Sequence, residues 1–297
     1  MKKQVDNGSV RSSLLVLAMI TLSAVLPAQQ TRADRISTEV DWDARLVVVT
    51  VERPISAVTT PGPAAVSRTQ RSIRDDAASI LLPILADIQF DSRRTVGGVV
   101  SETEELIAAL ERAAQRARPV DASAREDLSA ASVTFAVDLY RDLGAQFVTH
   151  SRAVPLERRL GWVAHTDYTG IIIHAADALP LFGTDEIVRP EAALFSGIYY
   201  LEDDTGLLYR LAEREHYAPE QLETQGAIAY TSDIQATGFS SRIGARPLRI
   251  LALAAFGERP TDIVISERDA LQIMASEANR GLLRSGRVVV VLESGQL

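Results

Sequence analysis

The chain has 297 residues, a net charge of −8, no cysteine, and lysine only at Lys2 and Lys3. It can therefore form no disulfide or thiolate site, and its main body offers no Schiff-base or P-loop lysine. An acidic chain of this kind is also a poor partner for nucleic acid or anionic lipid, which attract basic patches.

The first 28 residues have the pattern of a secretory signal peptide. Two lysines and Arg11 form a basic segment, and the apolar run 14–28 follows it. A run of about 15 residues is typical of a signal peptide and shorter than the roughly 20 residues of a membrane span. We predict export with cleavage after Ala28, or alternatively after Ala33. An uncleaved N-terminal anchor is the other interpretation.

The next predicted elements are a hairpin and a helix. Residues 36–40 and 46–51 are rich in β-branched side chains and flank a short polar turn. Apolar residues recur at helical spacing over 64–82, and Pro83 is expected to kink or end that helix. A strand with polar interruptions is predicted over 88–100.

The middle of the chain combines a helix with strands. Ser101 and Glu104 have the spacing of a capping box and predict a helix over 102–116. The polar, acidic stretch 119–130 predicts a linker or exposed loop. Two strands are predicted after it, at 132–140 and 145–150.

The C-terminal part is predicted to be rich in strands. The apolar run 168–175 predicts a buried strand, and the acidic turn 202–206 predicts a hairpin. Residues 212–244 lack periodicity and predict irregular structure. Ser266 and Asp269 are spaced to cap a final helix. That helix is predicted over 267–280, and further strands at 249–255, 262–265 and 288–292.

This order of elements predicts an α+β fold, in which three main helices pack on a mixed, largely antiparallel sheet. We expect a signal peptide at 1–28, an N-terminal ββαβα region at 29–118, a linker at 119–130 and a β-rich region at 131–297. The final helix should cover the last strand, whose continuous apolar character is typical of a central strand.

Histidines and carboxylates supply the first candidates for a site. His165 and Asp167, with His174 nearby, could hold a metal ion or form an acid–base pair, and Asp177 is another carboxylate partner for His174. The spacing matches no metal motif, however, and a polar strand residue beside loop residues explains it as well. The histidine at position 150 stands apart from this group.

Two further acidic groups lie downstream. Glu213, Glu215 and His216 could touch a metal, but a charged loop explains them equally. The run Glu202–Asp204 has a carboxylate density that suits calcium, yet it lacks the ligand spacing of a calcium loop and fits a hairpin turn.

The remaining motifs are incomplete. Gly238–Arg242 begins like a nucleophile elbow but has arginine where the second glycine belongs. Gly97 and Gly98 follow a basic pair without forming a phosphate-binding loop. The adjacent carboxylates Asp75-Asp76 and Glu104-Glu105 point about 100° apart on a helix and do not converge. We therefore predict no catalytic, cofactor-binding or metal-binding residues.

One family resemblance spans most of the chain. Its motifs are a strand with Val40-Asp41-Trp42, the run 168–173, Arg189-Pro190, the hairpin 197–209, the run 260–266 with its helix, and the last strand, 286–292. This order resembles exported bacterial proteins akin to LPP-type outer-membrane lipoproteins and flagellar assembly proteins P and T. The chain lacks the lipobox cysteine of the lipoprotein members. The resemblance implies a non-enzymatic envelope component that assembles around a larger structure.

Three functions remain open at this stage. The first is a periplasmic or outer-membrane-associated structural or assembly factor, with a flagellar role as one form of it, which binds other envelope proteins or itself. The second is a binding module for a small ligand or a glycan, for which Tyr199, Tyr200 and Tyr209 on one hairpin are candidates. The third is a hydrolase with a His/Asp site. We expect no cofactor and no nucleic-acid partner.

Overall fold

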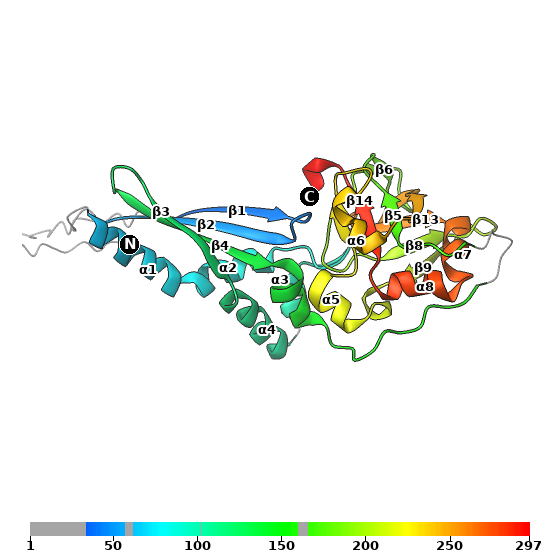
Figure 1. The fold of residues 1–297 in the computed structure, drawn as a ribbon, viewed down its shortest axis with the longest axis horizontal. Helices are drawn as coiled ribbons and strands as arrows, with labels where there is room; N and C mark the ends of the chain where they lie inside the picture. The colour runs from blue at the N-terminus through cyan, green and yellow to red at the C-terminus, as the bar shows by residue number, and fades with distance from the viewer. Residues whose placement is uncertain (1–33, 57–61, 102, 160–165) are drawn as a thin grey trace, which may run out of the picture. The chain divides into compact units, whose positions relative to one another are not determined.

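The computed structural model describes residues 34–56, 62–101, 103–159 and 166–297 and confirms the α+β class (Figure 1). Within these residues the strands form three four-stranded sheets and one short ribbon. The predicted signal peptide lies outside them. None of the described helices is long and apolar enough to cross a bilayer.

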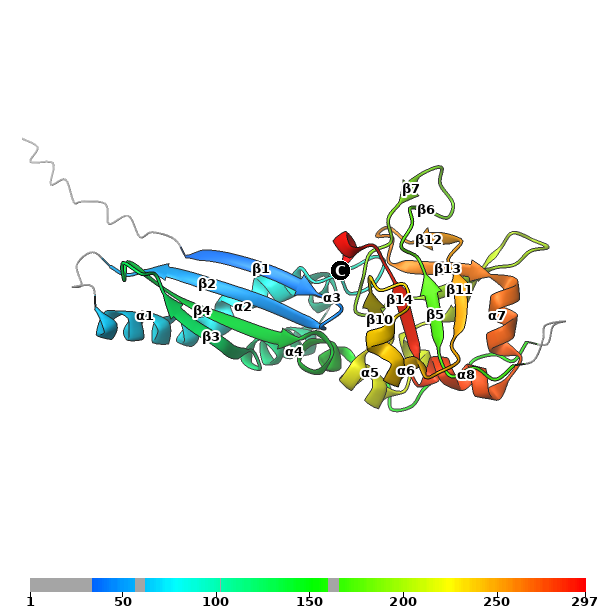
Figure 2. The ribbon, with the colours of Figure 1, turned by 45° about the horizontal axis from the view of Figure 1, so that its top comes forward.

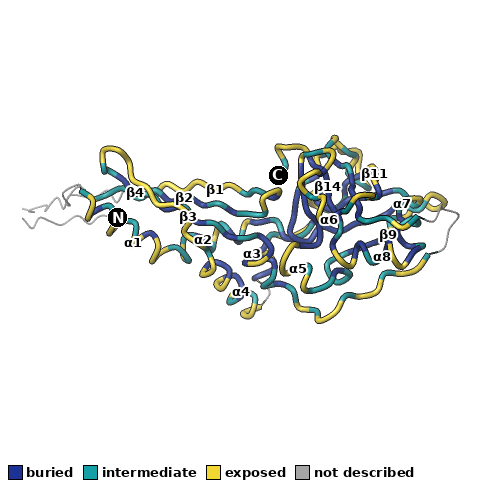
Figure 3. The backbone as a smooth tube through the Cα atoms, in the orientation of Figure 1, coloured by how far each residue is buried: buried dark blue, intermediate teal, exposed yellow. Residues whose placement is uncertain are grey.

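The first sheet is antiparallel, with the strand order β1-β2-β4-β3. Its strands are β1 (Arg35–Asp41), β2 (Leu46–Pro54), β3 (Arg118–Ala124) and β4 (Ala130–Asp138). β1 and β2 form the predicted hairpin. Buried and half-buried residues alternate along β2 and β4, so one face of this sheet is buried and the other is partly exposed (Figure 3).

Helices cover the buried face of this sheet (Figure 2). They are α1 (Pro63–Asp75), α2 (Ala77–Ala86), α3 (Val96–Val100) and α4 (Glu104–Gln115). α1 packs on β4, and α2 packs on α4. Ile73, Leu81 and Leu110 from these helices share one core with Val49 and Phe135 of the sheet.

The second sheet is parallel, with the order β10-β14-β5-β11. Its strands are β5 (Ile171–His174), β10 (Ala229–Thr231), β11 (Leu248–Leu251) and β14 (Val288–Val291). Ile171 and Val290 face the main core, whereas Ile172 and Val289 pack with Ile243 in a second cluster. Both faces are thus buried, which explains the continuous apolar runs and confirms the predicted central strand.

The third sheet is mixed, with the order β12-β13-β8-β9. Its strands are β8 (Ile198–Leu201), β9 (Leu208–Ala212), β12 (Ala254–Phe256) and β13 (Asp262–Ser266). β8 and β9 form the hairpin predicted around the acidic turn. The ribbon pairs β6 (Leu179–Pro180) with β7 (Ile187–Val188).

The remaining helices are short. They are α5 (Pro219–Gln225), α6 (Ser240–Ile243), α7 (Glu267–Met274) and α8 (Glu277–Arg284). The predicted cap of α7 is confirmed, because the Ser266 side chain accepts a hydrogen bond from the Asp269 amide at 3.1 Å. The single predicted helix divides in two. The prediction that it covers the last strand was wrong, because α7 packs on β13 and β8, while α6 packs on β14.

The predicted strand at 88–100 was wrong. Asp91 turns the chain there, and Thr95 caps α3 by accepting a hydrogen bond from the Gly98 amide at 3.3 Å. Pro83 does not end its helix, since the break falls at Asp76 and the proline lies inside α2. Burial of Leu81 and Leu85 on either side offsets the lost hydrogen bond.

Three other segments also differ from the sequence predictions. The expected linker 119–130 contains β3, whose residues are all exposed because it lies at the edge of the first sheet. The expected strand 145–150 begins with a 3₁₀ turn, Gly144–Phe147, which follows the π-helical turn Leu139–Leu143. The segment 212–244 contains α5, β10 and α6, so more helices form than the three main ones expected.

The turn after α2 joins the first sheet region to the C-terminal region. The Leu194 amide donates to the Gln89 carbonyl at 3.1 Å, and the Arg259 amide donates to the Ser92 carbonyl at 2.8 Å. A side chain at Gly257 would clash with Ser92, because a Cβ there would lie 2.3 Å from the serine Cβ. The backbone thus holds this turn against the strands beyond it.

Candidate ligand-binding pocket

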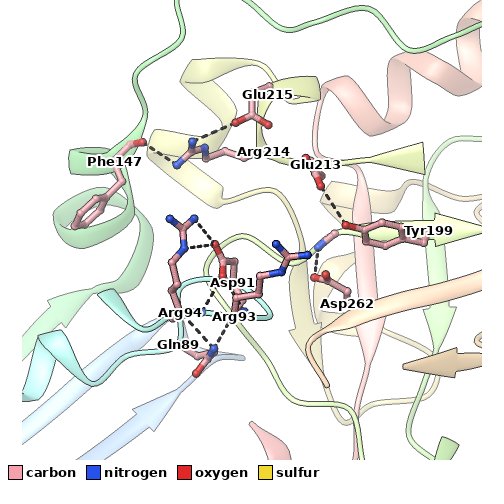
Figure 4. Close-up of polar contacts among 11 residues, drawn as sticks. Gln89, Asp91, Arg93, Arg94, Phe147, Tyr199, Glu213, Arg214, Glu215 and Asp262 are labelled. Carbon is pink, nitrogen blue, oxygen red and sulfur yellow. Dashed lines mark hydrogen bonds and ion pairs between the residues drawn. The ribbon is translucent and has the colours of Figure 1, made fainter. Parts of the chain in front are cut away.

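A pocket of about 440 Å³ lies where that turn meets the third sheet. Its walls come from residues 90–94, from the entrance and start of β8, from the end of β9 and the segment after it, and from the β12 and β13 strands. Figure 4 shows the polar side chains that converge there. Residues far apart in the sequence thus form one polar cavity.

The turn at 91–94 presents two arginines to the pocket. The Asp91 Oδ1 accepts hydrogen bonds from the Arg93 and Arg94 amides, both at 2.9 Å. Its Oδ2 forms an ion pair with the Arg94 guanidinium at 2.7 Å. Arg93 extends from the turn toward the side of the pocket that carries Tyr199 and Asp262 (Figure 4).

Asp262, the first residue of β13, is the buried carboxylate of the site. Its Oδ1 accepts a hydrogen bond from the Gly197 amide at 2.7 Å. Burial raises the pKa of Asp262, and hydrogen bonds from Gly197 and Ser92 oppose that rise. A Cβ at Gly197 would lie 2.8 Å from the Tyr199 ring, so glycine permits this close approach.

Glu213 has two partners in the pocket wall. It pairs with Arg210 at 2.6 Å and accepts a hydrogen bond from the Tyr199 hydroxyl at 3.1 Å. Burial raises the pKa of Tyr199 to about 12, so the phenol stays protonated at neutral pH and can donate. The Tyr199 ring packs edge-on against Phe256, with centroids 5.0 Å apart.

Arg214 is fixed by aromatic rings and by a neighbouring carboxylate. Its guanidinium lies 5.8 Å from the centroid of Phe90 and 5.5 Å from that of Phe195. It pairs with Glu215 at 3.1 Å and donates to the Phe147 carbonyl at 3.5 Å. These contacts use donors from both terminal nitrogens of the Arg214 guanidinium.

Three of the four pocket arginines therefore have a carboxylate partner within the pocket. Within the described ranges, the Arg93 side chain forms no hydrogen bond and no ion pair, and Asp262 has no ion-pair partner. The pocket thus keeps one unmatched positive charge and one unmatched negative charge. Such a site can bind a ligand that carries both.

The histidine candidates form no metal site among the described residues. His165 lies outside the described residues, and Asp167 accepts a hydrogen bond from the Ser276 hydroxyl at 2.9 Å. His174 lies 3.4 Å from the Arg249 guanidinium, and burial and that arginine lower the pKa of the imidazole. In the part of the chain that the structure describes, no three His, Asp or Glu side chains gather around a common point for a metal.

The members of the acidic group at 213–216 have different roles in the structure. Glu213 and Glu215 line the pocket, but the His216 Nδ1 accepts a hydrogen bond from the Glu213 amide at 3.1 Å and closes a short 3₁₀ turn. The acidic group at 202–204 forms the hairpin turn, in which Glu202 pairs with Arg159 at 3.2 Å. His150 bonds to a backbone carbonyl, that of Tyr217, at 3.0 Å.

The other motifs have structural roles. Arg242, at the end of the false nucleophile elbow, is buried and donates to the Gly286 carbonyl at 2.6 Å. Gly97 and Gly98 lie within α3. Asp76 pairs with Arg53 at 2.7 Å. The pair Glu104-Glu105 occupies the first turn of α4, where negative charge suits the helix dipole.

The three tyrosines of the β8–β9 hairpin do not form one cluster, because adjacent residues of a strand point to opposite faces. The Tyr200 and Tyr209 rings stack on one face of the hairpin, with centroids 5.5 Å apart, and Arg159 lies over both. Tyr199 alone lines the pocket. The sequence named Tyr199 and Glu213 as candidates but missed Asp262, which looked like the polar start of an apolar strand.

Comparison with known families matches two separate segments of the chain. Residues 34–146 match the family model of the N-terminal domain of Treponema pallidum Tp0624, and residues 170–294 match the model of its second domain. The chain is thus similar to two consecutive domains of one protein. The 90–94 turn falls in the first match, and the strands that complete the pocket fall in the second. A search of curated proteins found no match.

Proposed function

We propose that this protein is an exported, non-enzymatic cell-envelope protein that binds a small charged ligand in this pocket. The observation that carries the proposal is the pair of unmatched charges, Arg93 and Asp262, in a cavity whose other charges are paired. The volume of about 440 Å³ suits a small molecule. The glycan alternative is less favoured, since charged groups dominate the walls.

Ligand binding can be tested by thermal unfolding with a panel of small anions, cations and zwitterions. A ligand that binds only the folded state raises the melting temperature in proportion to ln(1 + [L]/Kd). The shift should shrink in Arg93→Gln and persist in Arg71→Gln, which removes an exposed arginine of α1 outside the pocket. Equal shifts in both variants would place the binding elsewhere and refute the proposal.

Export is part of the same proposal and has its own test. The basic segment and apolar run of residues 1–28 motivate it. The mass of the protein recovered from the periplasm or outer membrane should correspond to a chain that begins after Ala28 or Ala33. A full-length chain found only in the cytosol would overturn it.

The second candidate function is assembly with further copies or other envelope proteins, the role that the flagellar and lipoprotein resemblance implies. The observation in its favour is the β1 edge of the first sheet. β1 contains no proline and pairs with β2 in unbroken register, whereas β3 at the other edge has Pro119 and a register shift. Proline and bulges protect an edge from further pairing, so β1 is the more available strand.

Cysteine scanning can test this assembly role, because the chain contains no natural cysteine. Single cysteines placed along β1, at Ser37, Thr38 and Glu39, should form interchain disulfides if two copies pair through this edge. Ser123→Cys on β3 is the control. Equal yields from both edges would indicate random collision and would exclude strand pairing through β1.

A further inference from the structure

We propose that the pocket ligand is a zwitterion of the amino acid or short-peptide class, whose carboxylate binds Arg93 and whose ammonium binds Asp262. This assignment rests on the proposed ligand-binding function and specifies it further. It follows from which charged groups of the pocket are already in ion pairs and which are not.

The first step concerns the charges that are used. Asp91 binds Arg94 through two donors of the guanidinium, Nε at 3.2 Å and Nη2 at 2.7 Å. The other two ion pairs, at 2.6 and 3.1 Å, hold Arg210 and Arg214 in the wall. A ligand that competed for these groups would have to break an existing pair, so the remaining two charges define the preferred ligand.

The second step concerns the carboxylate end of the ligand. Arg93 is an exposed residue that lines the pocket, and its backbone amide donates a hydrogen bond to the Asp91 Oδ1 at 2.9 Å. A planar guanidinium with free donors binds a carboxylate through two parallel hydrogen bonds. The anchored turn holds the base of this side chain, so less conformational entropy is lost on binding.

The third step concerns the ammonium end. Asp262 is buried, with 4% of its surface exposed, and its hydrogen-bond donors are neutral groups. An ionised carboxylate in such a place is strongly stabilised by an incoming cation. The Tyr199 and Phe256 rings, which contact each other, also line the pocket.

Other ligand classes fit less well. A phosphate dianion would face four carboxylates, Asp91, Glu213, Glu215 and Asp262, with only Arg93 unmatched. A divalent metal ion would find Asp262 as its one unpaired carboxylate in the described pocket, and metals require several ligands. A ligand with one positive and one negative group matches both remaining charges.

The experiment measures the binding of alanine, dialanine and trialanine by calorimetry at neutral pH. These probes share their termini and differ in the distance between the ammonium and the carboxylate. The tightest of them is then compared with its N-acetyl form, which lacks the ammonium, and its C-terminal amide, which lacks the carboxylate. Each capped form should bind about 10- to 100-fold more weakly.

Variants assign each end of the probe to its residue. In Arg93→Gln the free probe and its amide should bind equally, because the carboxylate has lost its partner. In Asp262→Asn the free probe and its N-acetyl form should bind equally. Arg71→Gln should change nothing. If Asp262→Asn does not fold, the capped probes on the wild-type protein still decide the question.

Two results would overturn the assignment, and they differ in what they leave standing. If a charged ligand binds in an Arg93-dependent way while capped and free probes bind equally or not at all, the zwitterion is wrong and the pocket remains a binding site. If no charged compound of the panel binds, the proposed function fails as well.

Discussion

The antiparallel first sheet and the parallel second sheet are both rich in valine and isoleucine, yet they bury these residues differently. In β2, Val47, Val49 and Val51 are buried and the residues between them are partly exposed. In β14, every residue from Val288 to Val291 is buried. The first sheet has helices on one face, whereas the second lies between two apolar clusters.

The difference shows that strand composition predicts β-structure, while the elements packed around a sheet decide whether one or both of its faces are buried. A sheet covered on one face tolerates alternation of apolar and polar residues, and a sheet covered on both faces requires apolar residues throughout. Substitutions in the two sheets, in the contact between the first-sheet region and the C-terminal region, and in the pocket can test this contrast.

The largest effect is expected from a charge on the doubly covered sheet. Val290→Asp places a carboxylate on a strand whose four residues are all buried, and should cost about 4–5 kcal/mol, close to the whole stability of a marginal domain. Val48→Asp, on the partly exposed face of β2, should cost about 1 kcal/mol or less, including repulsion from Glu39 opposite. Urea unfolding measures both, and equal losses would refute the contrast.

A second test removes the arginine that holds two strands of the parallel sheet. The Arg242 guanidinium donates to the carbonyls of Gly286, before β14, and of Gln225, Gly226 and Ala227, before β10. Burial lowers its pKa to about 10, so it remains charged at neutral pH. Arg242→Met leaves these carbonyls unpaired and should cost about 2–4 kcal/mol in urea unfolding. Arg242→Lys should lose less, and equal losses would show that side-chain volume matters rather than hydrogen bonds.

A third test addresses the contact between the two regions. Gly226 has a φ of +71°, and a Cβ there would lie 2.2 Å from the Tyr140 ring. Gly226→Ala should cost about 3 kcal/mol, whereas Gly206→Ala, at a φ of +67° with open space around it, should cost about 1 kcal/mol. Thermal unfolding compares the two, and similar values would mean that the regions can separate locally without cost.

The smallest effect concerns the pH dependence of the pocket. Burial, and then Asp91 and Glu213, raise the pKa of Asp262. The folded state therefore holds its proton to higher pH than the unfolded state, and ionisation reduces stability as pH rises above the unfolded pKa of about 4. Relative to wild type, Asp262→Asn should gain stability as the pH rises above about 4. A difference that is constant with pH would show that the carboxyl titrates normally.

Local sequence signals were sufficient for many elements. The β1–β2 hairpin, the β8–β9 hairpin, the Ser266 cap and the central strand β14 follow from β-branched runs, turn residues and cap spacing, which act between near neighbours. β3 was missed because an edge strand that is exposed on both faces carries polar residues like those of a loop. The family resemblance to lipoproteins and flagellar proteins stays a prediction.

The sequence by itself determined the absence of cysteine chemistry, the α+β class and the strands with strong apolar patterns, because these depend on composition and local periodicity. Only the tertiary structure decided the pocket. Arg93 and Asp262 lie far apart in the sequence, and the backbone contacts of Ser92 and Gly197 bring them to one cavity. The charges that matter there are those left after three ion pairs form, and pairing depends on distances that the order of residues does not contain.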